Sequence, residues 1–172
     1  DYAWNIERYG VTMIPASPTQ LNLLLFNDDL QHYDSSRVQI ISYGTEAMPL
    51  VLLRRLSVAF PNARLLQSYG TSETGIIRVE SRPGTTWMRI KDKHCEHKIV
   101  DGELWLKTTS MTDGYLNADN KRFSGGWFRT GDIVKQDGDW FRIVARKDTI
   151  IKVGGLKVYP TEEQEVLMDV VD

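Results

Sequence analysis

The segment "ARLLQSYGTSETG", residues 63–75, joins an apolar run to a cluster of polar side chains. The apolar residues are typical of a short buried strand, and the polar residues follow where that strand is expected to end. A simple turn needs one or two glycines and perhaps an Asp or Asn. This segment carries more polar chemistry than that: Tyr69, Thr71, Ser72, Glu73 and Thr74. We therefore treat it as a candidate binding loop.

The first 80 residues alternate strand-like apolar runs with helical patterns. We expect strands at residues 11–14, 38–42 and 64–68. A helix is expected to begin at Pro18, where a capping-box pattern places Pro at the first helical position, and another near Pro49. Strands separated by single helices predict right-handed crossovers and a parallel βαβαβ sheet, hence an α/β fold class.

The carboxyl ends of such strands are where ligands bind in open parallel sheets. Here those ends are residues 15–17, 43–46 and 69–73, and two of the three contain Tyr-Gly-Thr. Glycine lets a ligand approach the backbone closely, while the ring and the hydroxyl supply contacts. The sequence therefore predicts a pocket at this edge of the sheet.

The pattern changes after residue 80 to short strand-like runs separated by turn signals such as "QDGD" and "VGGL". Regular spacing with little helix between the runs predicts a small antiparallel β-barrel-like subdomain. The runs are residues 86–90, 97–100, 103–107, 132–136, 140–144, 149–153 and 156–160. A second capping-box pattern, at residues 161–164, predicts the start of another helix.

Composition narrows the class of protein. The 172 residues include 21 Lys and Arg against 23 Asp and Glu, a formal charge of -2, which argues against a nucleic-acid partner. The single cysteine, Cys95, excludes an internal disulfide framework and suits a reducing compartment. No apolar run approaches the ~18 residues of a membrane span, and no signal peptide is visible. We expect a cytoplasmic protein.

Four separated segments resemble motifs of the adenylate-forming, AMP-binding enzyme superfamily, which includes acyl-CoA synthetases, luciferases and peptide-synthetase adenylation domains. "SYGTSETG" resembles its Tyr-Gly-x-Ser/Thr-Glu core, and "GELWLKTTSMTDGYLN" its Gly-Glu-Leu…Gly-Tyr segment. "GGWFRTGD" resembles its Trp-x-Arg-Thr-Gly-Asp motif, and "ARKDTIIKVGGLKVYPTEEQE" its interdomain hinge and the loop beyond. The order and spacing also match, over nearly the whole chain.

The resemblance implies three parts of a larger enzyme. Residues 1–80 would be the α/β portion of the large N-terminal domain, and residues 81–147 its β-barrel-like subdomain. Residues 148–172 would be the hinge and the start of a small α+β C-terminal domain. The family's phosphate loop and its C-terminal catalytic lysine match nothing in these residues, so we expect a fragment that forms no adenylate by itself.

The resemblance also implies a site for ATP with Mg²⁺. Glu73 would be the Mg²⁺ ligand and a catalytic residue, because a carboxylate is a hard oxygen ligand. Asp132 would accept hydrogen bonds from both ribose hydroxyls, and Tyr69 would stack on adenine. Thr45 stands where the family usually has a second glycine. The implied nucleotide-binding residues are Gly44, Thr45, Glu46, Ser68, Tyr69, Gly70, Thr71, Ser72, Asp132, Ile143 and Arg146.

The remaining implied roles belong to the hinge and the thioester step. Asp148 matches the hinge, although Ala145 and Thr149 depart from the common Gly-Arg-x-Asp-Asp pattern. The implied catalytic lysines and pantetheine-tunnel glycines are Lys152, Lys157, Gly154 and Gly155. Each position also fits a plainer role: polar turns, an Asp before a strand, a surface Arg, or a Gly-Gly hairpin turn.

The function that the resemblance implies is that of an AMP-forming acid–thiol ligase. Such an enzyme activates a carboxylic acid with ATP as an acyl-adenylate and transfers the acyl group to CoA or to a carrier-protein phosphopantetheine. Two alternatives remain open. The parent could be a peptide-synthetase adenylation domain, or the chain could be a truncated nonenzymatic protein that binds nucleotide or a partner, such as the remainder of its own parent enzyme. The identity of the acid is not readable.

Overall fold

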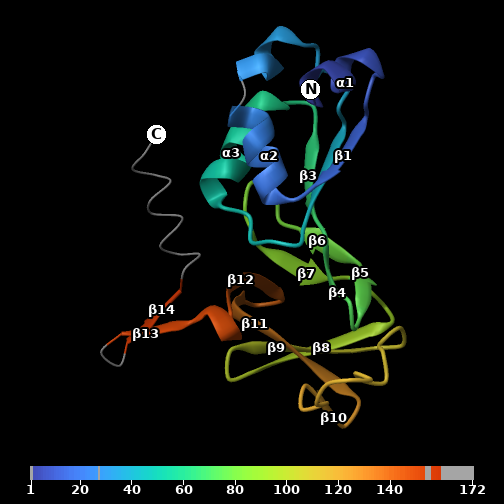
Figure 1. Cartoon of the computed structure of the whole chain (residues 1–172), viewed down its shortest axis with the longest axis vertical. Coiled ribbons are helices and arrows are strands. Elements are labelled where there is room, and N and C mark those ends of the chain that lie inside the picture. The colour runs from blue at the N-terminus through green and yellow to red at the C-terminus, as the bar shows by residue number, and fades with distance from the viewer. Residues whose placement is uncertain (1, 27, 154–155, 160–172) are drawn as a thin grey trace.

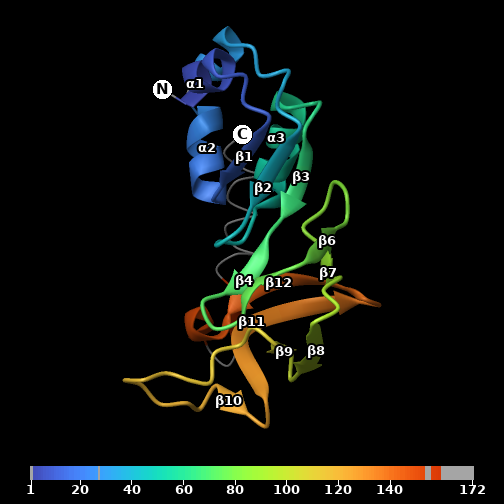
Figure 2. The same ribbon diagram turned by 90° about the vertical axis from the view of Figure 1, so that its right-hand side faces the viewer.

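The computed structural model describes residues 2–26, 28–153 and 156–159. An α/β part and an antiparallel β part follow one another along the longest axis of the molecule (Figure 1), and Figure 2 shows the same division from the side. No helix in these described ranges is long and apolar enough to cross a membrane.

The α/β part has the expected alternation of strands and helices. Its elements are α1 (Tyr2–Arg8), β1 (Met13–Ala16), α2 (Pro18–Phe26), the 3-10 helix η1 (Asp28–His32), β2 (Ile40–Tyr43), α3 (Leu50–Ala59) and β3 (Arg64–Gln67). The strands pair in the order β1-β2-β3, and both pairings are parallel, with Met13 opposite Ile40 and Ile40 opposite Arg64. The predicted parallel sheet is confirmed.

Apolar residues at helical spacing hold α2 and α3 against this sheet. The two crossovers run in the same direction, so both helices cover the same face, where α2 contacts α3. The core between helices and sheet contains Leu21, Leu24, Ile41, Tyr43, Leu52, Leu53, Leu56 and Phe60. The predicted capping box is also present: Ser17 N donates to Gln20 Oε1 over 2.9 Å, and Gln20 N donates to Ser17 Oγ over 3.2 Å.

The second part is an antiparallel sheet. Its strands are β6 (Val79–Ser81), β7 (Met88–Ile90), β8 (Cys95–Val100), β9 (Glu103–Thr108), β10 (Phe123–Ser124), β11 (Trp127–Asp137) and β12 (Trp140–Arg146). They pair in the order β6-β7-β12-β11-β9-β8, with β10 beside β11. Alternate inward-facing residues, among them Leu104, Leu106 and Phe141, form its core. The antiparallel architecture is as predicted.

Several boundaries differ from the sequence prediction. Residues 69–71, expected as loop, pair with residues 75–77 in an antiparallel hairpin of β4 (Tyr69–Thr71) and β5 (Gly75–Ile77). The strand expected to begin at Asp132 begins five residues earlier, at Trp127. These strands are stabilised by pairing with segments distant in sequence, which local periodicity does not report.

The described chain ends in a short hairpin. After the 3-10 turn η2 (Lys147–Thr149), β13 (Ile151–Val153) pairs with β14 (Leu156–Val158), and Lys152 lies opposite Lys157. The strand expected at residues 149–153 therefore begins later, because Lys147–Thr149 form the turn. Gly154, Gly155 and the helix expected at residues 161–164 lie outside the described residues.

Candidate nucleotide-binding site

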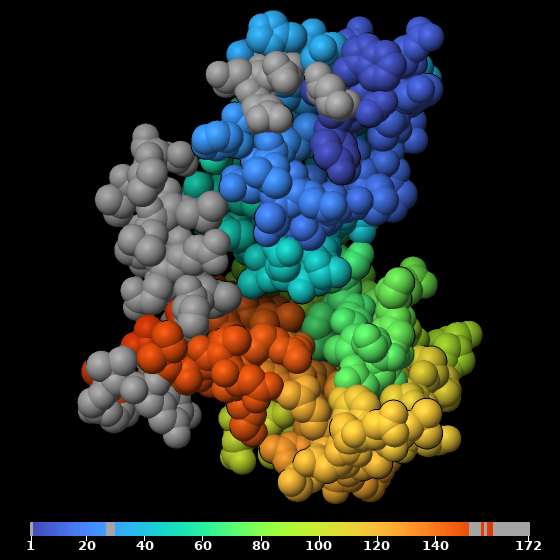
Figure 3. All heavy atoms as spheres, viewed as in Figure 1, coloured from blue at the N-terminus to red at the C-terminus, as the bar shows by residue number. Residues whose placement is uncertain are grey.

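A cavity of about 680 Å³ lies where the carboxyl end of the parallel sheet meets strands β11 and β12. Its walls come from residues 45–47, 67–73, 122, 128, 130, 132, 143, 145, 146 and 149. In Figure 3 the cyan, green and orange segments that carry these residues meet at the middle of the molecule. The carboxyl-end edge of the parallel sheet, where the sequence predicted a pocket, therefore forms one wall of the cavity, and the antiparallel sheet forms the other.

Asp132 is a buried, doubly hydrogen-bonded carboxylate in the wall of this cavity. It is 3% exposed, and each carboxylate oxygen has a strong donor: Tyr69 Oη donates to Oδ2 and Arg146 Nη1 to Oδ1, each over 2.7 Å. A buried carboxylate needs such partners to offset the loss of water. Carboxylate oxygens have further lone pairs. Asp132 can therefore accept additional hydrogen bonds from a ligand in the cavity.

Irregular pairing of β11 aims Asp132 at the cavity. The register shifts against β9 between Arg129 and Ile133, and against β12 between Ile133 and Val134. Gly131, inside the first of these irregularities, has φ +78°, a conformation that costs energy in a residue with a side chain. Bulges of this kind commonly redirect a side chain at a functional site. Asp132 thus lies within a bent strand.

Tyr69 supports Asp132 from β4. Its side chain is buried, and its ring meets Phe141 edge-on, with 6.4 Å between ring centroids. Burial raises the pKa of Tyr69 well above its ordinary value, and the negative charge of Asp132 raises it further, so the hydroxyl stays protonated and donates. The structure places Tyr69 in the cavity wall with its hydroxyl on Asp132. Stacking of its ring on adenine stays a prediction.

Glu73 lies in the turn between β4 and β5, on the cavity wall. Its Oε1 accepts a short hydrogen bond from Tyr115 Oη. Partial burial raises the pKa of Glu73, but the hydrogen bonds from Tyr115, the backbone and Thr71, with the positive charge of Arg122, lower it more. The net pKa is below the ordinary value, so the carboxylate is ionised at neutral pH.

A magnesium ion fits this donor set only together with a ligand. Within the described residues, no group of three or more His, Cys, Asp or Glu side chains converges to hold a metal. Mg²⁺ is commonly held by one or two carboxylates together with substrate phosphates and water. Glu73 offers one ionised carboxylate in a cavity large enough for such a ligand. A Mg²⁺–nucleotide complex is therefore compatible with the residues present.

The hairpin turn also supplies hydroxyl groups. Thr71 and Ser72 line the cavity, and the hydroxyl of Thr71 lies 3.1 Å from that of the fully buried Thr74. Gly70 is required here, because a Cβ atom at this position would lie 2.3 Å from the carbonyl oxygen of Gly75 across the hairpin. The close pairing of β4 with β5 thus holds residues 71–73 against the cavity.

The loop after β2 forms the far end of the cavity. Thr45 and Glu46 line it, whereas Gly44 lies behind, where a Cβ atom would be 2.8 Å from the carbonyl oxygen of Ser68. Thr45 has φ +69°, an unusual conformation for a β-branched residue. Such strain often occurs at functional sites, where the surrounding structure holds it.

The side chains near this loop already have partners. Glu46 Oε2 accepts hydrogen bonds from Thr19 Oγ1 and Thr19 N, over 2.6 and 3.2 Å, at the start of α2. The hydroxyl of Ser68 lies 2.7 Å from that of Ser42. Ile143 lines the cavity from β12 and is half-buried. This end of the cavity therefore combines two polar side chains that already have hydrogen-bond partners, Glu46 and Ser68, with an apolar wall at Ile143.

The residues after β12 are tied to the antiparallel sheet. Asp148 is not in the cavity wall; its carboxylate is exposed and receives a 2.8 Å ion pair from Arg122 Nη2. Beside it, Lys147 Nζ lies 2.8 Å from Glu103 Oε2. Lys152 and Lys157 lie opposite each other in the following hairpin of β13 and β14. The structure thus brings most of the predicted nucleotide-binding residues together around one cavity.

Sequence reasoning missed several residues of this site. Cavity-lining residues that were not predicted to belong to the site are Ala47, Gln67, Arg122, Phe128, Thr130, Ala145 and Thr149. Two more act on the site through a neighbour: Tyr115 on Glu73 and Glu103 on the turn before Asp132. Thr130, Tyr115 and Glu103 lie inside the quoted motifs, so the motifs could have identified them as site residues. Arg122 lies outside these motifs, and no sequence pattern pointed to it.

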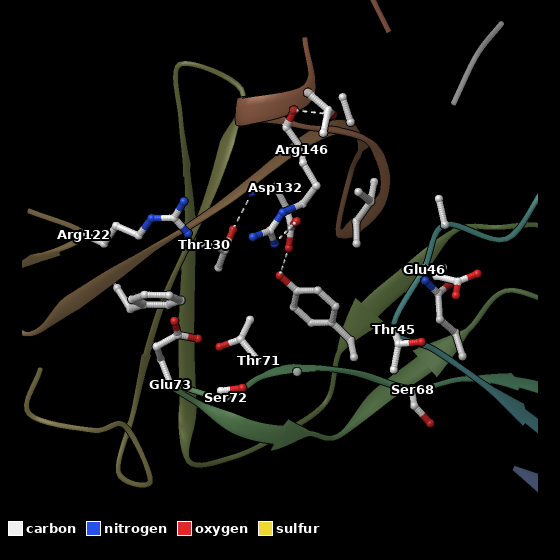
Figure 4. A pocket seen from close by; sticks show the side chains of 18 residues that line it. Thr45, Glu46, Ser68, Thr71, Ser72, Glu73, Arg122, Thr130, Asp132 and Arg146 are labelled. Carbon is white, nitrogen blue, oxygen red and sulfur yellow. Dashed lines mark hydrogen bonds and ion pairs between the residues drawn. The ribbon is translucent and has the colours of Figure 1, made fainter. Parts of the chain in front are cut away.

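The arrangement of the site has a clear order. In Figure 4, Thr45 and Glu46 lie at one end, Glu73 and Arg122 at the other, and Asp132 with Arg146 between them. The cavity therefore has a partly apolar end, a buried carboxylate in the middle and a charged end. A nucleotide presents a base, a ribose diol and phosphates in that same order.

Comparison with known proteins identifies the family of the chain. The family model "AMP-binding enzyme" matches residues 1–116, so the chain belongs to that family. It is 31% identical to the long-chain-fatty-acid–CoA ligase of Haemophilus influenzae over 95% of the chain and 32% of that protein. It is 30% identical to acyl-CoA synthetase 7 of Caenorhabditis elegans over 96% of the chain and 34% of that protein. The chain thus spans about a third of the length of these two relatives.

Solved structures show the same fold. An anthranilate CoA ligase in complex with anthranoyl-AMP superposes with a TM-score of 0.83, at 24% identity, over 97% of this chain and 36% of that one. The o-succinylbenzoate CoA synthetase of Bacillus subtilis, in complex with its acyl-adenylate intermediate, gives a TM-score of 0.78 at 28% identity, over 98% of this chain and 38% of that one. The same synthetase in complex with ATP and magnesium ion gives a TM-score of 0.73 at 26% identity, over 99% and 39%.

Proposed function

We propose that this chain holds the AMP moiety of ATP, and then of an acyl-adenylate, in an AMP-forming acid–thiol ligase. The observation that carries the proposal is Asp132: a carboxylate 3% exposed, fixed by Tyr69 and Arg146, in the wall of a cavity of about 680 Å³. A carboxylate held in this way is suited to accept both hydroxyls of a ribose.

The remaining groups take their roles from their places around Asp132. The loop with Gly44, Thr45 and Glu46, with Ser68 and Ile143, would enclose the adenine. Arg146 would give a second ribose contact, because its guanidinium keeps donors beyond the one on Asp132. Glu73 would hold Mg²⁺ against the phosphates, with Thr71 and Ser72 as hydroxyl donors.

The reaction follows from binding of ATP beside a carboxylic acid. A carboxylate oxygen attacks the α-phosphorus, the bond to the bridging oxygen breaks, and pyrophosphate leaves with its electron pair. A thiolate then attacks the acyl carbonyl, and AMP leaves as the thioester forms. Mg²⁺, when bound, neutralises charge on the phosphate oxygens. The protein groups contribute mainly by positioning and by charge stabilisation.

CoA is the thiol that we propose, because the relatives' names are those of CoA ligases and acyl-CoA synthetases. A carrier-protein pantetheine would present the same thiol and is the alternative acceptor. Lys152 and Lys157 are proposed to assist the thioester step, and Gly154 with Gly155 to leave room for the pantetheine arm. Asp148 is proposed as the hinge residue between the two steps.

Calorimetric titration of this chain with AMP, ATP and 2′-deoxy-AMP, each with and without Mg²⁺, tests the proposal. We expect AMP to bind, and 2′-deoxy-AMP to bind about 10-fold or more weakly, because a hydrogen bond to a charged group is worth about 1.5–3 kcal/mol. Mg²⁺ should strengthen ATP binding in the wild type but not in Glu73→Gln. Glu80→Gln, an exposed glutamate paired with Arg89, is the matched control. Equal affinity for AMP and 2′-deoxy-AMP, or no binding of any nucleotide, would overturn the proposal for this chain.

A further inference from the structure

Glu103, the first residue of β9, is a buried carboxylate outside the cavity wall. It is 4% exposed. Its Oε1 accepts the backbone N–H of Gly131 over 3.2 Å, and its Oε2 accepts Lys147 Nζ over 2.8 Å. Arg129 Nη2 lies at 3.4 Å from the same Oε2. One oxygen therefore faces the residue before Asp132, and the other faces the residue before Asp148.

The bond to Gly131 replaces a missing ladder contact. Against β9 the pairing jumps from Arg129–Trp105 to Ile133–Glu103, so the segment between is bulged out of register. Its polar groups bond elsewhere: Thr130 Oγ1 donates to the carbonyl oxygen of Leu104 over 2.7 Å, and Gly131 N donates to Glu103. Asp132 follows directly and points at the cavity. The Glu103 carboxylate thus helps to fix the backbone that aims Asp132.

Lys147 belongs to a run of three anchored side chains. Arg146 pairs with Asp132, Lys147 with Glu103, and Asp148 with Arg122. The Lys147 side chain is half exposed, so it can leave Glu103 for water at modest cost. Glu103 is buried and would keep only the longer, 3.4 Å ion pair with Arg129, so loss of the 2.8 Å partner costs the carboxylate more than it costs Lys147. Loss of Lys147 should therefore destabilise the Glu103 side chain and, through it, the bulged segment at Gly131 whose N–H Glu103 accepts.

We propose that Glu103 is a positioning residue that couples the turn at residues 147–149 to the ribose acceptor Asp132. While Lys147 is paired with Glu103, the Gly131 peptide and the Asp132 carboxylate keep the geometry that accepts the ribose hydroxyls. When the Lys147–Glu103 ion pair breaks, affinity for the ribose falls. The coupling rests on the proposed function, because the ribose role of Asp132 is assigned there. By thermodynamic linkage, bound AMP in turn favours the seated position of Lys147.

Two readouts separate this coupling from a purely structural ion pair. The first is affinity for AMP against 2′,3′-dideoxy-AMP, which lacks the diol and should not sense the position of Asp132. The second is hydrogen exchange of the Gly131 amide, followed by ¹⁵N NMR, which needs no ligand. The variants are Lys147→Met, which removes the cation and keeps the stem, and Glu103→Gln, alone and combined. Lys107→Met is the matched control, since Lys107 lies on β9 with Glu103 but pairs with Glu96 of the neighbouring β8 over 2.9 Å.

The coupling predicts a specific pattern. Lys147→Met should weaken AMP about 5-fold or more, the low end of ordinary coupling energies, and leave dideoxy-AMP within about 2-fold. Its Gly131 amide should exchange faster than in the wild type. The double variant should bind AMP no more weakly than Glu103→Gln alone, because both changes act along one route. Lys107→Met should change none of these quantities.

The opposite results are equally clear. If Lys147→Met leaves both AMP affinity and Gly131 exchange unchanged, the coupling is refuted, whatever happens to stability. Equal losses for AMP and dideoxy-AMP would also refute it. If the wild-type chain binds no nucleotide, the proposed function fails for this chain, and the Gly131 amide alone decides the coupling: faster exchange in Lys147→Met supports it, and unchanged exchange overturns it. Because the Lys147 side chain is half exposed, its variant is expected to fold even where Glu103 variants do not.

Discussion

Replacement of Asp132 by Asn tests the central feature of the site. The substitution keeps the size and one acceptor oxygen but removes the charge and replaces the other oxygen by an amide donor. In the wild type both oxygens already accept 2.7 Å hydrogen bonds, from Tyr69 and Arg146. Whichever way the Asn amide turns, its NH₂ group therefore faces one of these donors.

The magnitude follows from the number of charged hydrogen bonds that are lost. If the Asp132 carboxylate accepts both ribose hydroxyls, Asn loses at least one charge-assisted bond, about 1.5–3 kcal/mol. At 1.36 kcal/mol for each factor of ten, AMP should bind about 10- to 160-fold more weakly. The same argument predicts a loss of folding stability of about 2 kcal/mol, since Tyr69 and Arg146 lose their charged acceptor.

The assay is calorimetric titration with AMP and with 2′,3′-dideoxy-AMP, at a temperature where circular dichroism shows the variant folded. The dideoxy ligand should bind wild type and variant alike, because it has no hydroxyl for Asp132. Asp137→Asn, an exposed aspartate on the same strand that pairs with Arg82 over 3.5 Å, is the control. AMP affinity within about 2-fold of wild type in Asp132→Asn would refute the ribose assignment, because one charged hydrogen bond is worth more than that.

Three further predictions concern the strained and titrating residues of the site. Thr45→Gly should stabilise the fold by up to about 1 kcal/mol in urea unfolding, because relief of the positive φ is worth about 1–2 kcal/mol and glycine's extra chain entropy costs part of it; a destabilised variant would contradict this. Gly131→Ala, at φ +78°, should destabilise by about 1–2 kcal/mol in the same assay and weaken AMP; unchanged stability would show that the bulge tolerates a side chain. The folded-state pKa of Glu73 is lowered from 4.5, so its stabilising contribution is present above that pH and is lost as pH falls through the lowered value. Tyr115→Phe removes one cause of the lowering, so unfolding free energy should fall less steeply below pH 4.5; an identical slope would show that Tyr115 does not act on Glu73.

Much of the α/β part was predictable from local patterns. The capping box at Ser17 and Gln20, the apolar spacing of Leu52, Leu53 and Leu56, and the alternation of strands with helices each report a local balance of burial and backbone hydrogen bonding. The parallel order then follows from connection rules. The motif resemblance added the identities of Asp132, Arg146 and Glu73 as site residues.

The geometry of the site was not predictable in this way. Tyr69 and Asp132 are 63 residues apart, and their hydrogen bond exists only because β4 packs against β11 and β12. The bulges that aim Asp132 depend on which residues of β9 and β12 lie opposite, and the roles of Glu103 and Arg122 depend on the turn after β12. No local window of sequence contains these partners.

The sequence by itself determined the class of fold, the parallel sheet, and the segments that carry polar chemistry, because these depend on periodicity, capping and motif order over short stretches. Only the tertiary structure decided which donors fix Asp132, that Tyr69 is a buried support, and that Thr45 is held at a positive φ. The physical reason is that hydrogen bonds and ion pairs between distant segments are set by how the two sheets pack, and a buried carboxylate takes whichever partners that packing provides.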